Sequence, residues 1–256
     1  MSLRPLYLES GTPWQVRLDA GVALHVAAPG RTRSLYPLRR LARVVCGSQA
    51  EWRTDALIAC LRAGVPVVFH DGCGDAVAWC FGPRRRETTL AQLLREGIEQ
   101  PDWTARFGQW LEATARREAL AALRALGTSS LRLDAAAVRS HLCNRHRLRT
   151  TLPAGPWLRA LQHATEGLVA EVLHGAVGDP ALIGFARPGL HLGQEVSALL
   201  EWRLHRILYA MPENKLHTHS PGRLAAVAVE CHTAMLHAAC RDLLGDLELQ
   251  LRSWLL

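Results

Sequence analysis

The spacing of apolar residues changes along the chain, and it predicts strands in the first third and helices after it. Up to residue 82, short apolar or alternating runs bounded by turn residues are typical of β-strands. These runs cover residues 6–8, 14–18, 22–26, 41–46, 65–69 and 76–81, with tight turns at 19–21 and 71–74. Residues 51–63 have helical spacing, and Gly64 follows them as a C-terminal glycine. The first 82 residues are therefore expected to form a mainly β domain with one helix.

Beyond residue 87 the apolar positions recur every three or four residues, which is the helical period. Helices are predicted over residues 88–100, 102–126, 134–143, 156–177, 194–209 and 222–254. Thr89 and Asp102 are the expected N-caps of the first two helices, and Gly245 is expected to interrupt the last one. Proline and three arginines at 83–86 mark a linker over residues 83–87. The predicted fold class is α+β, with an N-terminal mainly-β domain (1–82) followed by an all-α C-terminal domain (88–256).

Composition narrows the classes of function that remain. Hydrophobic residues make up 49% of the chain, but they form no run of eighteen, so no membrane partner is expected. The N-terminus has no apolar segment typical of a signal peptide, which favours a cytoplasmic protein. The 7 cysteines form no CxxC pair, and reduced thiols are expected rather than disulfides or a cysteine zinc site. The net charge of +7 favours a polyanionic partner.

Residues 34–82 carry a more specific signal than composition does. The phrases PLRRLARVV (37–45) and TDALIACLRAGVPVVFHDGCGDAVAW (54–79) stand in a strand, helix, strand and hairpin. They closely resemble the N-terminal domain of the CRISPR spacer-acquisition integrase family (Cas one). The resemblance implies a dimer formed through the β domain and an all-α domain that carries the active site. It also implies double-stranded or branched DNA as partner, namely prespacer and CRISPR repeat, and the small adaptation protein Cas two.

The same resemblance implies a metal site, and this chain departs from it. The family holds Mg²⁺ or Mn²⁺ with a glutamate, a histidine and a later acid, and uses the metal for transesterification at phosphorus. Asp134 stands nearest to the glutamate position, while Glu166 fits locally but lies too late. Ala186 and Arg187 stand where the histidine is expected, and a guanidinium does not bind a cation. The triad is therefore not intact, and no metal or other cofactor is expected unless another site has formed.

Two interpretations of the remaining residues stay open. In the first, Asp134 and Glu195, with His191, form a rebuilt metal site, Glu195 being reached by shifting the alignment two residues from Gly193. In the second, Asp134 is a helix N-cap, His191 lies in a loop and Glu195 is a solvated acid of a first helical turn. The sequence favours the second. His217 and His219 have a spacing that suits a metal, but no cluster of acids or cysteines accompanies them and the sequence favours a polar loop.

Clusters of arginine support DNA binding. Arg145, Arg147 and Arg149 precede the proline-containing start of a long helix, where the resembled family carries a basic stretch. Arg203 and Arg206 fall on a later helix, and Arg187 lies between the two groups. Arginines placed in this way bind phosphate and give affinity without sequence choice. The alternative is that these arginines belong to an ordinary arginine-rich surface and have no role in DNA binding.

Together these observations predict an adaptation protein that binds prespacer or repeat DNA and is catalytically impaired or inactive. It would act as a structural subunit, as a dimer with itself or beside an active paralogue. One alternative is an active metal-dependent endonuclease or integrase with a rebuilt site. The other is a protein-interaction subunit that no longer binds DNA.

Overall fold

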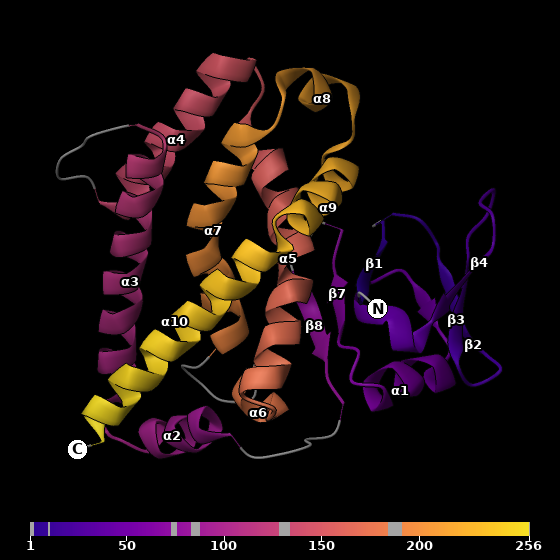
Figure 1. Ribbon diagram of the computed structural model, residues 1–256, viewed down its shortest axis with the longest axis horizontal. Coiled ribbons are helices and arrows are strands. Elements are labelled where there is room, and N and C mark those ends of the chain that lie inside the picture. Colours follow the sequence, from indigo (N-terminus) through magenta and orange to yellow (C-terminus); the bar gives the residue numbers. More distant parts are fainter. Residues whose placement is uncertain are drawn as a thin grey trace.

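The computed structural model describes residues 3–9, 11–72, 76–82, 88–127, 134–183 and 191–255, and it places strands before helices along the chain (Figure 1). The strands are β1 (Arg4–Leu8), β2 (Gln15–Asp19), β3 (Ala23–Ala27), β4 (Ser34–Pro37), β5 (Leu41–Gly47), β6 (Glu51–Trp52), β7 (Val67–His70) and β8 (Ala76–Cys80). The helices are η1 (Leu38–Arg40), α1 (Thr54–Arg62), α2 (Thr89–Ile98), α3 (Trp103–Ala125), α4 (Ala135–Thr150), α5 (Ala154–Ala176), α6 (Pro180–Ile183), α7 (Leu192–Ala210), α8 (Glu213–Thr218), α9 (Pro221–Cys231) and α10 (Thr233–Trp254). The predicted α+β fold class is thereby confirmed.

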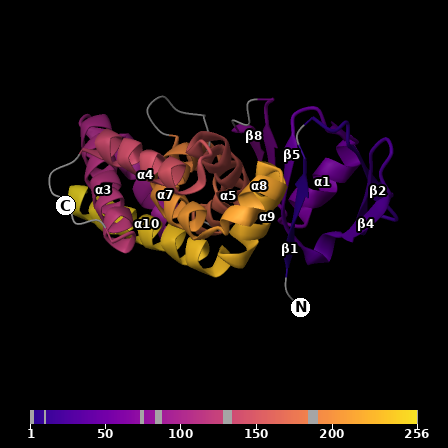
Figure 2. The ribbon, with the colours of Figure 1, turned by 90° about the horizontal axis from the view of Figure 1, so that it is seen from above.

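The strands form two four-stranded sheets with the orders β1-β5-β7-β8 and β4-β3-β2-β6. In the first sheet β5 lies parallel to both β1 and β7, while β8 returns antiparallel to β7. The second sheet is built on the predicted hairpin of β2 and β3. Helix α1 packs against strands of both sheets, and Figure 2 shows it between them. Apolar side chains from both sheets and from this helix form one core, including Val16, Leu24, Val44 and Cys60.

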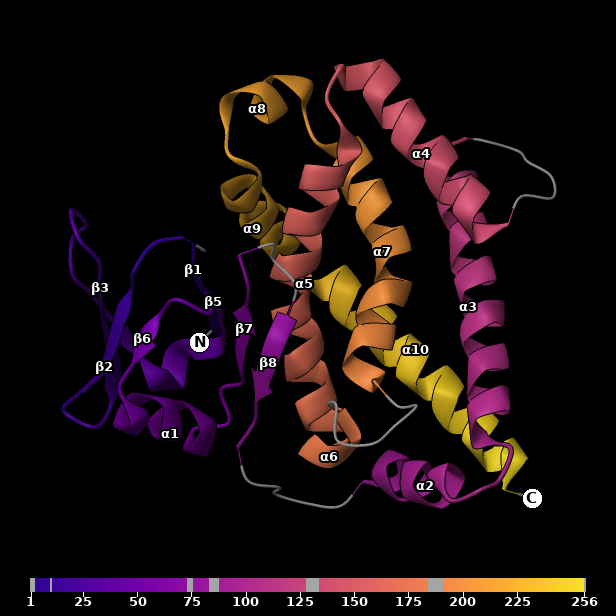
Figure 3. The same cartoon turned by 180° about the vertical axis from the view of Figure 1, so that it is seen from behind.

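Helix α5 is the centre of the α-helical part. It packs against α7, α9 and α10, and its other side faces β5 and β7 of the first sheet (Figures 1 and 3). Along α5 the buried residues surround the helix rather than forming one stripe, which is the pattern of a helix enclosed by neighbours. Two apolar cores lie on its flanks, one with α2, α3, α7 and α10 and one with α7, α9 and the start of α10.

Close approach between α5 and β5 depends on a glycine. A Cβ at Gly167 would meet the Cγ2 atom of Val45 at a distance too short for real contacts, and it would lie 3.1 Å from Cδ of Arg43. A glycine inside a helix costs about 0.5–1 kcal/mol relative to alanine. At this position glycine is required because any larger side chain would prevent the buried strand β5 from packing directly against α5.

Several predicted boundaries differ from the structure. The last helical segment is interrupted at His232, where α9 ends and α10 begins, and not at Gly245. Thr88 rather than Thr89 caps α2, because its hydroxyl accepts a hydrogen bond from the Ala91 amide. Asp102 holds Arg106 and makes no side-chain cap.

Several short elements, and the full length of one helix, were not predicted from the sequence. Residues 51–52 pair with β2 instead of opening α1, and α4 continues to Thr150. Strand β4 and the short helices α6 and α8 were not predicted. The linker at 83–87 and part of the turn at 71–74 lie outside the described residues, so the proposed domain limits remain predictions.

Candidate functional site

The three candidate metal ligands lie at the starts of two helices. Asp134 is the N-cap of α4, and its Oδ1 accepts a hydrogen bond of 2.7 Å from the Ala137 amide. His191 precedes α7, and Glu195 stands in the first turn of that helix. Partial burial raises the pKa of Glu195 above its usual value, and the nearby His191 opposes this shift. Asp134 therefore has a structural role that is complete without a cation.

These residues do not fit the family's metal. Among the described residues, no three His, Cys, Asp or Glu side chains converge in a way that would hold a cation. His217 lies in α8 rather than in a loop, with its Nε2 3.9 Å from Glu213, and it belongs to no such group either. We therefore derive no metal-dependent step, and the roles assigned to Asp134, His191 and Glu195 remain predictions.

The predicted DNA-binding arginines fall into two kinds, and one kind is engaged inside the protein. Arg149 donates to the carbonyl oxygens of Leu208 and Met211 at the end of α7, at 3.3–3.4 Å. Its guanidinium also stacks 4.8 Å from the ring centroid of Tyr209. Arg203 holds Glu118 of α3 with an N–O distance of 2.7 Å. These contacts fasten helices together, so Arg149 and Arg203 have structural roles.

The other kind faces solvent. Arg147 on α4 and Arg206 on α7 are exposed, and neither makes an ion pair within the part of the chain that the structure describes. Arg145 lies between the two kinds, because it is half-buried and its guanidinium also lies over the ring of Tyr209, 5.3 Å from the centroid. Arg187 lies outside the described residues. The exposed cations Arg147 and Arg206 on these two adjacent helices define what we call the α4–α7 surface.

Under this surface α4 and α7 run in the same direction and are joined by a polar group in which His205 is buried, Glu201 is half-buried and Arg139 is exposed. Arg139 near the start of α4 donates to Glu201 at 2.9 Å, and His205 lies 3.7 Å from the same carboxylate. Burial by itself would raise the pKa of Glu201, but the neighbouring His205 and the hydrogen bonds from Arg139 hold it below its usual value. The carboxylate is therefore charged at neutral pH and links both helices.

Burial lowers the pKa of His146 to about 4, with further lowering by the charges of Arg149 and His205. A histidine in the unfolded chain titrates near 6.5, so between about pH 6.5 and 4 the unfolded state binds more protons. The contribution of neutral His146 to stability is thus complete above pH 6.5 and is lost as the pH falls through this window. We expect urea unfolding midpoints at pH 7 and pH 4.5 to differ less in His146→Gln than in the wild type. Equal pH dependence in both proteins would contradict this assignment.

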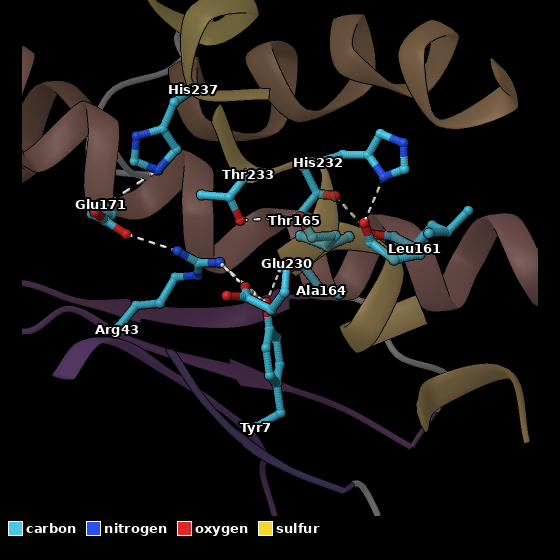
Figure 4. Close-up of polar contacts among 12 residues, drawn as sticks. Tyr7, Arg43, Leu161, Ala164, Thr165, Glu171, Glu230, His232, Thr233 and His237 are labelled. Carbon is cyan, nitrogen blue, oxygen red and sulfur yellow. Dashed lines mark hydrogen bonds and ion pairs between the residues drawn. The ribbon is translucent and has the colours of Figure 1, made fainter. Parts of the chain in front are cut away.

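A buried cation joins the β sheet to helices α5 and α9 (Figure 4). Arg43 of β5 is 1% exposed, and its guanidinium donates to Glu171 of α5 and to Glu230 of α9, each at 2.8 Å. It also lies 3.2 Å from the hydroxyl of Tyr7 on β1. Burial raises the pKa of Tyr7 to about 12, so the hydroxyl keeps its proton. His237 of α10 approaches the other oxygen of Glu171 at 3.8 Å.

Only one feature of the sequence indicates this buried ion-pair network. Arg43 is a charged residue within the apolar run of β5, where an unpaired charge would be very costly. Such a residue predicts a buried partner, but the partners are far away in sequence, at separations of 128 and 187 residues. The network therefore serves to hold the β and α parts together.

A second polar pair lies at the same boundary. His70, at the end of β7, is 2% exposed, and its Nε2 is bonded to the carboxylate of Glu166 on α5, which is 7% exposed. The ring of His163 stacks against His70 with centroids 5.1 Å apart. Glu166 was the weaker candidate for the family's glutamate, and the structure gives it a buried partner instead. His70 and His163 line an open cavity of about 500 Å³ between β1, α5 and α9.

The protein thus has a β part and an α-helical part, which are held together by the ion pairs of Arg43 and His70. Comparison with solved structures finds the same architecture over nearly the whole chain. A CAS1 protein from Thermotoga maritima has a TM-score of 0.69 at 12% identity, covering 97% of each chain. The chain therefore has the fold of the CAS1 proteins, and the resemblance predicted from residues 34–82 is confirmed at that level.

Two further solved structures share this fold. TtCas1 in a complex with DNA has a TM-score of 0.61 at 16% identity, covering 94% of this chain and 91% of the other. A casposase bound to integration product has a TM-score of 0.55 at 11% identity, covering 85% of this chain and 73% of the other. No protein-family model and no curated sequence matches the chain.

Among the helices that the structure describes, none combines the length and hydrophobicity needed to span a bilayer.

Proposed function

We propose that this chain is a DNA-binding protein of CRISPR adaptation that holds prespacer or repeat DNA and performs strand transfer poorly or not at all. The observation that carries the proposal is the α4–α7 surface on a CAS1 fold, where Arg147 and Arg206 are exposed without an ion pair to any described residue. Such cations are available to phosphate, unlike Arg149 and Arg203, which hold other parts of the protein. The net charge of +7 supports the same partner.

Support for impaired chemistry comes from the residues themselves. Arg187 stands near the position where the resemblance requires a histidine ligand. Asp134 uses its carboxylate to cap α4. We therefore assign the chain a structural role in the cytoplasm, as a homodimer or beside an active paralogue, together with the small protein Cas two. Mg²⁺ or Mn²⁺ would be needed only for the alternative, an active enzyme with a rebuilt site.

The proposed DNA-binding surface is tested by salt dependence. Binding of a branched duplex to wild type, Arg147→Gln, Arg206→Gln and the double variant is measured by fluorescence anisotropy between 50 and 300 mM salt. Each phosphate contact contributes about 0.9 to the slope of log K against log salt. We expect each single variant to reduce the slope by about 1 and the double variant by about 2.

Arg124→Gln is the matched control, because Arg124 is exposed at the end of α3 and has no ion pair to a described residue. It is expected to leave the slope unchanged. An equal loss in Arg124→Gln and Arg147→Gln would show that affinity follows net charge alone, and the α4–α7 surface would have no special role. A wild type that does not bind even at 50 mM salt would favour the protein-interaction alternative.

The same reactions, supplied with Mn²⁺ or Mg²⁺, report on catalysis. Cleavage and strand transfer are followed on denaturing gels while anisotropy records binding. We expect binding without turnover. Turnover that disappears in Asp134→Ala or Glu195→Ala would overturn the structural role and establish a rebuilt metal site.

A further inference from the structure

The cavity between β1, α5 and α9 is lined neither by Arg147 or Arg206 of the α4–α7 surface nor by Asp134, His191 or Glu195. It is open to solvent and has a volume of about 500 Å³. Small-molecule sites in proteins commonly measure about 300–1,000 Å³. Its apolar wall consists of Leu8, Val45, Ala160, Ala164 and Ala226. This is more room than a simple inorganic anion fills, and the wall suits the flat apolar part of an organic ligand.

The polar part of the lining is positive. Arg159 of α5 and Arg223 of α9 border the cavity, and both are exposed. Neither makes an ion pair with a residue that the structure describes. The acid of the rim, Glu9, is bound to Arg31 at 2.7 Å and so is largely neutralised. Two guanidinium groups from different helices are thus the uncompensated charges of this cavity.

Guanidinium groups arranged in this way favour phosphate, which accepts two parallel hydrogen bonds from each of them. The rim adds the first turn of α9. Ser220, its N-cap residue, makes no side-chain capping bond, and Gly222 also lines the cavity. Amide groups at a helix start lack helical partners and favour an anion. These groups add to the two arginines rather than defining the site alone.

The floor of the cavity carries two histidine rings. His70 is fixed by its hydrogen bond to buried Glu166, and the ring of His163 lies against it, tilted by 33°. Both line the cavity. His70 is almost fully buried, so the half-buried ring of His163 and the apolar wall beside it offer a nucleobase the surface on which to stack. Because His70 is anchored by a buried carboxylate, this surface exists before any ligand arrives.

We propose that this cavity binds the phosphate group of a nucleotide through Arg159 and Arg223, with the base against His163 and the apolar wall. The shared chemistry is a nucleotide phosphate, and two sources carry it: a free mononucleotide or the phosphorylated end of a DNA strand. The second source rests on the proposed function, whereas the first does not.

Binding of AMP and dAMP to the full chain is measured by isothermal titration calorimetry. A 5′-phosphorylated and a 5′-hydroxyl oligonucleotide of the same sequence are compared by anisotropy. We expect Arg159→Gln and Arg223→Gln each to weaken binding about tenfold, because each removes a charge-assisted contact to phosphate. Ala226→Leu fills part of the cavity without changing charge and is expected to weaken binding as well. Arg124→Gln is the charge-matched control and should bind as the wild type does.

Each outcome decides the proposal. Mononucleotide binding that is lost in the two cavity variants but retained in Arg124→Gln supports a free ligand. No mononucleotide binding, but a preference for the phosphorylated oligonucleotide that depends on Arg159 and Arg223, supports a strand end. The proposal is overturned if all cavity variants bind as tightly as the wild type. It is also overturned if the wild type binds no mononucleotide and does not distinguish the two oligonucleotides. If the salt experiment shows no general DNA binding, the mononucleotide measurement still tests the cavity, so the two proposals can fail separately.

Discussion

Replacing Arg43 with methionine is expected to lower the free energy of unfolding by about 3 kcal/mol. Methionine keeps much of the length and the apolar stem, but it leaves Glu171 and Glu230 without their buried cation. Removing one partner of a buried ion pair usually costs about 3–5 kcal/mol, and the lower figure applies because both carboxylates are partly exposed, at 27% and 38%. For a chain of this length the expected loss corresponds to roughly 6–12 °C in Tm.

Urea unfolding followed by circular dichroism measures the effect. Arg39→Met is the matched control, since Arg39 is exposed on η1 just before the same strand and makes no ion pair to a described residue. It is expected to change the free energy of unfolding by less than about 0.5 kcal/mol. Adding Glu171→Gln and Glu230→Gln to Arg43→Met should restore part of the lost stability, because the unpaired charges are then gone. An Arg43→Met protein as stable as Arg39→Met would refute the role assigned to this network.

Replacing Gly167 with alanine is the second large effect, with an expected loss of about 2 kcal/mol in the free energy of unfolding. Alanine normally stabilises a helix interior relative to glycine by about 0.5–1 kcal/mol. At this position the added Cβ collides with Val45 and crowds Cδ of Arg43 at 3.1 Å. The strand and α5 must move apart, which disturbs both the packing and the ion pairs.

Gly108→Ala provides the opposite expectation. Gly108 lies inside α3, where an added Cβ meets nothing within 4 Å. This variant is expected to gain about 0.5–1 kcal/mol, so the two substitutions should differ in sign under the same urea titration. If Gly167→Ala were stabilising too, the close approach of β5 to α5 would be disproved.

Both effects bear on function because the cavity and the α4–α7 surface depend on how the helices are held. Arg43 joins β5 to α5 and α9, the two helices that carry Arg159 and Arg223. Loosening that contact alters the spacing of the two arginines that the proposed nucleotide site requires. We therefore expect Arg43→Met to bind nucleotide somewhat more weakly than the wild type, although Arg159 and Arg223 are both still present.

The sequence by itself determined features that depend on near neighbours in the chain. Alternating and unbroken apolar runs placed the strands of the first sheet, and the helical period placed the long helices from residue 88 onwards. Asp134 was recognised as a possible N-cap because that interaction spans only three residues. Ala186 and Arg187 lie outside the described residues, so the departure from the resembled family's metal ligands stays a prediction from the sequence.

Short elements and element ends were less predictable for a physical reason. Strand β6 forms because β2 offers it hydrogen-bonding partners, and the two strands are distant in sequence. The interruption between α9 and α10 lies at His232, whose Nδ1 is 2.8 Å from the Ala228 carbonyl oxygen, whereas Gly245 is accommodated within α10. Glycine lowers helix propensity only slightly, and tertiary packing outweighs so small a preference.

Only the tertiary structure decided what each arginine does. Arg147 and Arg149 are two residues apart, yet one is exposed and the other binds carbonyl groups at the end of α7. Arg43 and Glu230 are separated by 187 residues and meet in a buried ion pair. Charge and composition predict how many cations a chain carries, but burial and partner are set by which helices pack together. Residue type and spacing therefore determined the fold and the basic character of this protein, whereas long-range packing decided which arginines hold it together and which remain available to a ligand.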